Sequence, residues 1–441
     1  MKKPLYVSLY DHYKALIEDG TLKAGTKLIS IRRCCEEQEI SRTTVETAYM
    51  QLAADGYIIS KPQSGYYVCD VGAAPKIDFS EPESKRKLAP RVLYDFRSAS
   101  ADPDSFNVNE WGRYVKSVLR HPERLLSYGE PQGEPELRRE ICEYAEKQRG
   151  VVCTDEQVVV AAGTQSLLHI LCGIIKRPES AFFTGAYFGQ GEAVLEDHGI
   201  KAVRMPYEEL ESEKIPSGSL IYISPSHMTK WGQVLSVSGR RKLLRLSQST
   251  DSLIIEDDYD SEFRYFGRPV PSLQGMDAGN NVIYIGSFSR LLLPSIRLSF
   301  MVLPKKLLGA YSLRSKSYNQ TASKTEQLAL CSYMRDGRLY SQIRKQRKLY
   351  FSKSAALCDE IKNVFGSFAD AKTGDSGYLV LMEINSEKSS RCLAKTALNA
   401  GVAVSAVEPD GGRPKLLLCC SGMEEGNFRQ ALICLRDALA L

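Results

Sequence analysis

The chain has 441 residues, 43% hydrophobic and 25% charged, which is the composition of a folded protein long enough for more than one domain. Its net charge of +5 is too small to indicate a polyanion partner by itself. No apolar run could span a bilayer, the N-terminus lacks a signal-peptide core, and the twelve cysteines show no CxxC or zinc-ligand spacing. These features exclude a membrane protein and a zinc protein, and they predict a cytoplasmic protein with reduced thiols and no metal.

The first 70 residues are predicted to form three helices and a hairpin. Apolar residues at helical spacing predict a helix over 5–19, and Ser30 is suited to cap a second helix over 31–38. Ser41 is suited to cap a third helix, which ends at Gly56. Two β-rich runs follow, over 57–60 and 66–69, separated by a turn-forming segment. This order predicts a winged helix-turn-helix, an α+β domain over residues 1–70.

Motifs in this region resemble the GntR-type winged helix along nearly its whole length. They are LKAGTKL (22–28), ISRTTV (40–45), LAADGY (52–57) and SG (64–65), in order and at the family's separations. The resemblance implies a double-stranded DNA operator as the partner. Charge adds little, because nine Lys and Arg against eight Asp and Glu leave only +1 over residues 1–69.

The predicted DNA-binding residues lie on the second helix of the motif, on the helix before it and on the wing. The N-terminal end of a recognition helix reaches base edges, and an Arg there can read guanine with two hydrogen bonds. Basic residues on the preceding helix and on the wing suit phosphates. The set is Arg32, Ser41, Arg42, Thr43, Thr44, Lys61 and Gly65.

Residues 71–92 are rich in Ala, Pro, Ser, Glu and Lys and are predicted to be a linker. From 93 to 441, apolar strand-like runs alternate with helical segments, which predicts a mostly parallel sheet with helices on its faces. We expect a large subdomain over about 110–310 and a smaller C-terminal one over about 311–441. Beyond about Ser312 the pattern predicts helices, including a basic stretch over 335–353.

The segment IIEDDYDSEFRY (254–265) resembles the cofactor loop of fold-type I, pyridoxal phosphate (PLP)-dependent aminotransferases. Together with the N-terminal motifs, it makes the chain similar to MocR-type regulators, in which a GntR-type winged helix is fused to an aminotransferase-like α/β domain. The resemblance implies that Asp257 pairs with the pyridine nitrogen of the cofactor and that Tyr259 donates to its ring hydroxyl. Such a carboxylate keeps the nitrogen protonated.

A phosphate-binding group is implied by the same resemblance. Gly163, Thr164 and Gln165 lie between a predicted strand and a helix, and a helix N-terminus binds phosphate through its N–H groups. Three residues of the segment VIYIGSFSRLLLPSIRL (282–298) would complete the group: Ser287, Ser289 and Arg297.

Arg290 stands where the family carries the lysine that forms a Schiff base with PLP. A guanidinium stays protonated and is not a practical nucleophile towards an aldehyde, so any PLP is predicted to bind without a covalent link. Two roles for Arg290 stay open. It could donate to the aldehyde oxygen or the phosphate, or it could fill the space and pair with Asp257.

Other positions depart from the family pattern. Tyr187, in GAYFG (185–189), takes the aromatic place of a turn whose two prolines are missing. His227 ends SPSH (224–227) and either contacts the ring or has a structural role. Leu417 takes the place of the arginine that often holds the substrate carboxylate. Lys230 is the remaining candidate for a replacement lysine in a loop near the pocket.

The sequence therefore predicts a transcriptional regulator without catalytic residues. The family resemblance implies that the winged helix binds its operator as part of a homodimer, and we expect the aminotransferase-like domain to bind a small-molecule effector related to PLP. Two alternatives stay open. The pocket could be vestigial or serve another small anion, as Arg290 and Leu417 would favour, or the chain could be a working aminotransferase fused to a DNA-binding module.

Overall fold

The computed structural model describes residues 3–71, 91–97, 100–185, 188–210, 215–228, 233–264, 270–277, 279–374, 378–407 and 412–440. The chain divides into two compact units, Met1–Leu88 and Ala89–Leu441. The predicted linker lies almost entirely outside the described residues.

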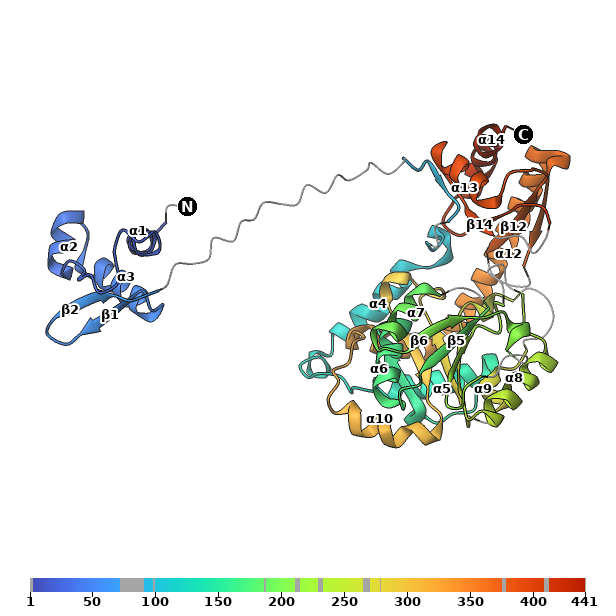
Figure 1. Cartoon of the computed structure of the whole chain (residues 1–441), viewed down its shortest axis with the longest axis horizontal. Helices are drawn as coiled ribbons and strands as arrows, with labels where there is room; N and C mark the ends of the chain where they lie inside the picture. The colour runs from blue at the N-terminus through green and yellow to red at the C-terminus, as the bar shows by residue number, and fades with distance from the viewer. Residues whose placement is uncertain are drawn as a thin grey trace. The chain divides into compact units, whose positions relative to one another are not determined.

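The N-terminal unit is a three-helix domain with a β-hairpin (Figure 1). Its elements are α1 (Leu5–Glu18), α2 (Ile31–Gln38), α3 (Arg42–Ala54), β1 (Ile58–Lys61) and β2 (Gly65–Val68). The predicted caps are confirmed, because the hydroxyl of Ser30 accepts from Arg33 N–H and that of Ser41 accepts from Thr44 N–H. The strands differ from the predicted ones by one residue at their ends, because the antiparallel ladder continues to Lys61 opposite Gly65.

The C-terminal unit is built on a seven-stranded sheet, in the order β4-β10-β9-β8-β7-β5-β6. Its strands are β4 (Val158–Ala161), β5 (Ser180–Thr184), β6 (Lys201–Arg204), β7 (Leu220–Ile223), β8 (Leu253–Asp258), β9 (Val282–Ser287) and β10 (Ser299–Val302). Only β10 pairs in antiparallel fashion, with β4 and β9 on its two sides. The prediction of a mostly parallel sheet is therefore confirmed.

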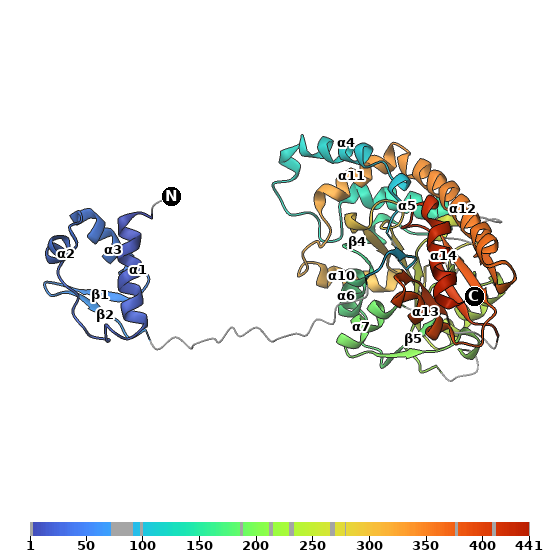
Figure 2. The same ribbon diagram turned by 90° about the horizontal axis from the view of Figure 1, so that it is seen from above.

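Helices cover both faces of this sheet, which explains why its strands are almost wholly apolar. Figure 2 shows α6 (Thr164–Ile174) and α10 (Leu308–Ser315) on one side of β4, with α5 (Pro135–Arg149) and α11 (Lys324–Arg335) on the other. The first face also carries α7 (Gly189–Asp197), and the second carries α8 (Val237–Ser249) and α9 (Leu273–Met276). Helix α4 (Val108–Leu119) packs on α11.

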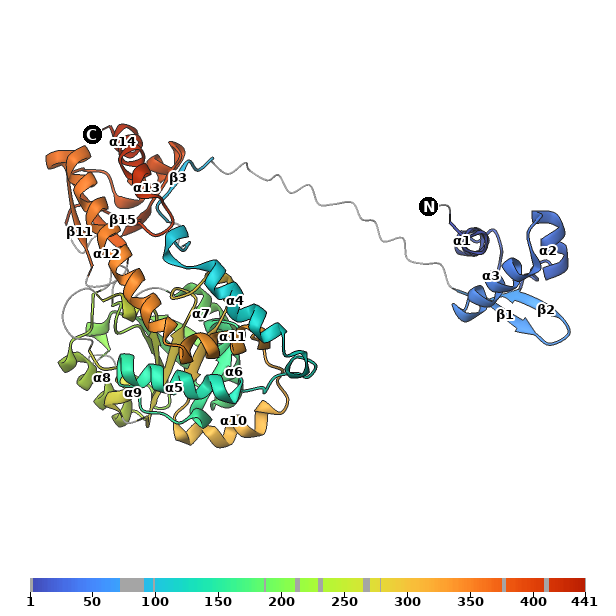
Figure 3. The same cartoon turned by 180° about the vertical axis from the view of Figure 1, so that it is seen from behind.

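The 28-residue α12 (Arg338–Phe365) runs from α11 to a smaller sheet at the C-terminal end, as Figure 3 shows. This sheet has the order β11 (Ala369–Thr373), β12 (Leu379–Ile384), β15 (Lys415–Cys419), β14 (Ser405–Val407) and is packed by α13 (Ser390–Asn399) and α14 (Phe428–Leu439). Upstream, β3 (Tyr94–Asp95) pairs with β13 (Val402–Ala403). The expectation of helices beyond Ser312 is confirmed for α11 and α12, which contain the basic stretch, but the region also contains the short strands of this sheet.

None of the helices in the described ranges is both long and apolar enough to cross a membrane.

Candidate functional site

A cavity of about 350 Å³ opens where β8 and β9 end and α6 begins. Nine of the predicted cofactor-binding residues line it: Gly163, Thr164, Gln165, Asp257, Tyr259, Ser287, Ser289, Arg290 and Arg297. The lining also includes Phe188, Gln190 and Ser299, which the sequence did not single out. The strands and the helix therefore bring together segments that are more than 130 residues apart in the sequence.

One end of the cavity is shaped to accept an anion. Gly163 precedes the first turn of α6 with φ of 97°, and a Cβ at this position would clash with the guanidinium of Arg297. Arg297 itself has φ of 54°, which directs the backbone back into β10. The hydroxyls of Ser287 and Ser299 lie 3.0 Å apart, and that of Ser287 accepts from the N–H of Ser289. Serine hydroxyls, the N-terminus of α6 and a guanidinium therefore line the same cavity, and such groups can hold an anion.

At the other end lies the carboxyl group of Asp257, which is buried within β8 rather than after it, because the ladder with β9 extends to Asp258 opposite Gly286. Tyr222 on β7 donates a hydrogen bond to Asp257 Oδ2, with 2.5 Å between the oxygens. Burial raises the pKa of Asp257 to about 7, although the hydrogen bond from Tyr222 opposes this shift. A cation beside Asp257 would restore the charged form.

An aromatic pair borders the cavity beside Asp257. The rings of His227 and Tyr259 are stacked, with centroids 4.5 Å apart and planes 10° from parallel. His227 is buried, its pKa is lowered by that burial, and its Nε2 atom has no hydrogen-bond partner among the described residues. The neutral imidazole therefore supports the Tyr259 ring that lines the cavity.

Arg290 also lines the cavity. Its guanidinium carbon lies 5.0 Å from the ring centroid of Tyr378, whose hydroxyl donates to Asp260 Oδ2 at 2.7 Å. Burial works against the charge, but Tyr378 and Asp260 raise the pKa of Arg290, so the guanidinium stays protonated. The described residues contain no ion pair between Arg290 and Asp257, which the sequence left open; Asp257 is held by Tyr222 instead.

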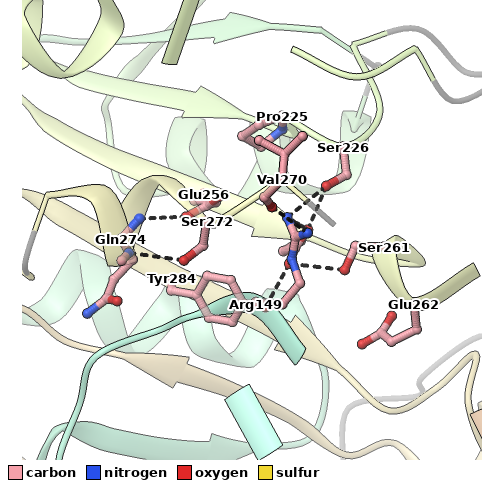
Figure 4. Close-up of polar contacts among 12 residues, drawn as sticks. Arg149, Pro225, Ser226, Glu256, Ser261, Glu262, Val270, Ser272, Gln274 and Tyr284 are labelled. Atoms are coloured by element: carbon pink, nitrogen blue, oxygen red, sulfur yellow. Dashed lines mark hydrogen bonds and ion pairs between the residues drawn. The ribbon is translucent and has the colours of Figure 1, made fainter. Parts of the chain in front are cut away.

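A buried polar network that includes Arg149, Ser226, Ser261 and Tyr284 (Figure 4) holds the next residue of β8. Asp258 accepts from Nε and Nη2 of Arg149, at 2.5 and 3.2 Å, and from the hydroxyls of Ser226, Ser261 and Tyr284. Burial alone would raise the pKa of Asp258, but these donors hold it below its usual value.

Glu256, two residues earlier on the same face of β8, accepts from the backbone N–H groups of Leu273 and Gln274 at the start of α9. The residues before and after Asp257 in β8 are thereby held in place, so Asp257 has little freedom to move.

Some predicted positions fall elsewhere. Tyr187 and Lys230 lie outside the described residues. Leu417 is a buried residue of β15 and does not line the cavity. A larger cavity of about 690 Å³ lies beyond β5 and β6, but its lining holds none of the predicted cofactor residues, so we place the site in the smaller one.

The predicted DNA-binding residues of α3 form its exposed N-terminal turn. Ser41 has a structural role as the helix cap, and its hydroxyl lies 2.8 Å from that of Thr44. Arg42 has an 80% exposed side chain that pairs with Glu46 at 2.8 Å, and Thr43 is exposed beside it. These side chains can reorient towards a groove, since only surface contacts hold them.

Two further basic residues lie on other parts of the N-terminal unit. Arg32, near the start of α2, is 91% exposed and pairs with Glu36. Lys61 lies at the end of β1, with Nζ 4.6 Å from the ring centroid of Tyr67, and Gly65 opens β2 with φ of 107°. The hairpin therefore presents a cation on a wing whose tight turn requires glycine.

Sequence models of two families match the chain. The model for bacterial regulatory proteins of the gntR family matches residues 5–68, and that for aminotransferase class I and II matches residues 99–434.

Full-length relatives share both parts. The HTH-type transcriptional regulator YdeL of Bacillus subtilis (strain 168) is 35% identical, over 91% of this chain and 88% of its own. The probable rhizopine catabolism regulatory protein MocR of Rhizobium meliloti is 30% identical, over 99% and 94%. The pyridoxine biosynthesis transcriptional regulator PdxR of Corynebacterium glutamicum is 24% identical, over 98% and 95%.

Among solved structures, an archaeal alanine:glyoxylate aminotransferase superposes with a TM-score of 0.68 at 20% identity, covering 78% of this chain and 90% of the other. At this identity the likeness concerns the fold, which is the predicted fold-type I architecture.

Proposed function

Because the chain belongs to the MocR-type regulators of the GntR family, we propose that it controls transcription in response to a phosphorylated ligand held without a covalent link in the cavity between α6, β8 and β9. The observation that carries this proposal is the gathering of nine predicted cofactor residues around one cavity with Arg290 in their midst.

The N-terminal unit would read DNA through the first turn of α3. Arg42, Thr43 and Thr44 would face base edges in the major groove, while Arg32 and Lys61 would neutralise phosphates. Ser41 would orient this turn by capping it, and Gly65 would shape the wing. The weak net charge of the unit means that specific contacts, rather than general attraction, would supply much of the affinity.

The lining of the cavity fits PLP or a close relative. Arg297, Ser287, Ser289 and the α6 N-terminus would hold the phosphate, and the space that a Cβ at Gly163 would fill is kept clear beside Arg297. The raised pKa of Asp257 is the mark of a buried carboxyl group that lacks a cationic partner, and a pyridinium nitrogen would provide one. The relative PdxR is named for pyridoxine biosynthesis, which supports a ligand of this class.

Arg290 would occupy the position of the family's Schiff-base lysine. When bound, PLP supplies an electron sink for bonds next to an amine, but that chemistry starts from a covalent link to a neutral amine. A guanidinium cannot supply that amine, so the ligand would act as an effector and the cavity as its binding site.

A homodimer would give the regulator two DNA-binding units for two half-sites. The C-terminal unit carries exposed apolar side chains suited to such an interface. In the loop before α5, Leu126 is 87% exposed and Tyr128 97% exposed. Side chains this apolar and this exposed are expected to be covered by a partner, and a second copy is the simplest one.

A second candidate is a regulator whose cavity takes a different small anion. The specific observation in its favour is Arg290 itself, because two guanidinium groups line a cavity of only about 350 Å³. A third is an aminotransferase, in which Lys230, in a loop predicted to border the pocket, would replace the missing lysine.

An equilibrium titration with PLP separates these candidates. Absorbance and tryptophan fluorescence would follow binding, and borohydride reduction with mass spectrometry would then detect any covalent link. We expect saturable binding without a mass increase for the wild type, and a mass increase for Arg290→Lys. A trapped adduct on the wild type would favour the enzyme, and absence of binding would favour the non-PLP ligand. Selection of bound fragments from a random DNA pool, with Arg42→Ala as the control, tests the DNA-binding part.

A further inference from the structure

We propose that Arg290 makes the cavity selective for ligands that carry an oxygen acceptor, an aldehyde or a carboxylate, at the ring position where PLP carries its aldehyde, and that it disfavours an amine there. The inference rests on the proposed function, because it assumes that a phosphorylated pyridine occupies the cavity.

The position of the Arg290 side chain is fixed by its surroundings. The guanidinium lies against the face of the Tyr378 ring, and the Tyr378 hydroxyl is bonded to the buried Asp260. The backbone carbonyl of Arg290 accepts from Nε2 of the buried Gln346 on α12. A guanidinium is a directional donor, since its N–H groups project in its own plane in a fixed fork.

The charge of the lining residues also favours an oxygen acceptor over an amine. Among the described lining residues, Arg290 and Arg297 are cations and Asp257 is the carboxyl group, with its pKa raised to about 7 by burial. A ligand phosphate would be matched to Arg297, which leaves Arg290 facing the rest of the ligand. An ammonium group placed there would meet a like charge in a poorly hydrated space, whereas a carbonyl or carboxylate oxygen would accept a charge-assisted hydrogen bond.

Asp260 is the group that opposes this preference. Its Oδ2 atom is occupied by Tyr378, and its buried Oδ1 atom has no hydrogen-bond partner among the described residues. Asp260 is not part of the cavity lining, so an amine would have to pass Arg290 and Tyr378 to reach it. The preference of the cavity therefore follows Arg290 unless the ligand displaces that side chain.

The test uses four phosphorylated pyridines that differ only in the substituent at the ring position where PLP carries its aldehyde. They are the 5′-phosphates of pyridoxal, pyridoxine, pyridoxamine and 4-pyridoxic acid. Full-length protein would be titrated with each by calorimetry in a buffer without primary amines, and borohydride reduction would check the pyridoxal sample for covalent reaction. We expect the carboxylate and the aldehyde to bind about tenfold to a hundredfold more tightly than the amine, the range expected of a charge-assisted hydrogen bond.

Two variants then separate the roles of the two arginines. Arg290→Gln should bring the four affinities to within about threefold of one another, because it keeps a donor and removes the charge. Arg297→Gln should weaken all four ligands and leave their order unchanged, because it acts on the phosphate they share. Circular dichroism would establish that both variants fold, and the wild-type ranking alone tests the inference if one does not.

The outcomes are distinct. If all four ligands bind the wild type equally, the inference is wrong while the proposed function stands. If pyridoxamine 5′-phosphate binds most tightly, Asp260 rather than Arg290 sets the preference, and the inference is again wrong. If none of the four binds, the proposed PLP-like ligand is wrong and the inference fails with it.

Discussion

Replacing Arg149 should destabilise the C-terminal unit strongly, although residue 149 does not line the cavity. The side chain of Arg149 is 5% exposed and that of its partner Asp258 is 0% exposed. Arg149 also donates to the carbonyl of Val270 and to the hydroxyl of Ser226. Arg149→Met would keep much of the apolar volume but leave the Asp258 carboxylate buried without its cation. Breaking one side of a buried ion pair costs about 3–5 kcal/mol.

The tryptophans allow this effect to be measured on the full chain. Both of them, Trp111 and Trp231, lie in the sequence of the C-terminal unit, so tryptophan fluorescence follows the unfolding of that unit alone. In urea, the loss of unfolding free energy should lower the midpoint concentration of unfolding by on the order of 1 M. Lys147→Met is a matched control on the same helix, because Lys147 is 60% exposed and its ion pair with Glu143 lies at the surface.

A double variant tests whether the unpaired buried charge of Asp258 causes the loss of stability. Asp258→Asn combined with Arg149→Met removes both charges, and we expect it to be more stable than Arg149→Met alone because no unpaired charge stays buried. If Arg149→Met and Lys147→Met shift the midpoint equally, or if the double variant is no more stable than Arg149→Met, the account of the buried pair is wrong.

Three other changes test other parts of the molecule. Arg42→Ala should abolish operator selectivity with an unchanged circular dichroism spectrum, because its side chain is 80% exposed; unchanged affinity in a mobility-shift assay would remove it from the DNA interface. Gly163→Ala should weaken PLP binding by at least about tenfold, because a Cβ would clash with Arg297; equal affinity in a fluorescence titration would refute the anion site. The carboxyl of Asp257 has a pKa raised from 3.8 to about 7, so its contribution to stability is present below pH 3.8 and is lost as the pH rises through 7. Asp257→Asn should therefore stabilise the unliganded unit by roughly 1–3 kcal/mol at pH 8 and much less at pH 5, as urea unfolding would show, and an equal effect at both pH values would contradict the assignment.

Local signals in the sequence predicted the N-terminal unit well. Ser30 and Ser41 cap α2 and α3 as expected, because capping depends on the residue itself and on N–H groups three positions away. The family resemblance also named nine of the cavity residues, and two of these, Asp257 and Ser287, lie at the carboxyl ends of parallel strands, where ligands bind in such sheets.

The residues that the sequence did not reveal contact site residues that are distant from them in the sequence. Tyr222 belongs to an apolar β7, where a tyrosine suggests core packing, and only the pairing of β7 with β8 brings its hydroxyl to Asp257. Tyr378 lies just before β12, and its contact with Arg290 spans 88 positions of the chain. Neither contact has a spacing or motif that a single sequence could display.

If the proposed function is right, these long-range contacts would allow a cavity without a covalent anchor to be selective. A covalent link tolerates a loosely shaped pocket, whereas a non-covalent ligand depends on groups that are already in place when it arrives. Here β8 is fixed through Asp258 and Arg149, Asp257 is oriented by Tyr222, and Arg290 is held against Tyr378. Loosening any of these supports should therefore weaken ligand binding without removing a single direct contact.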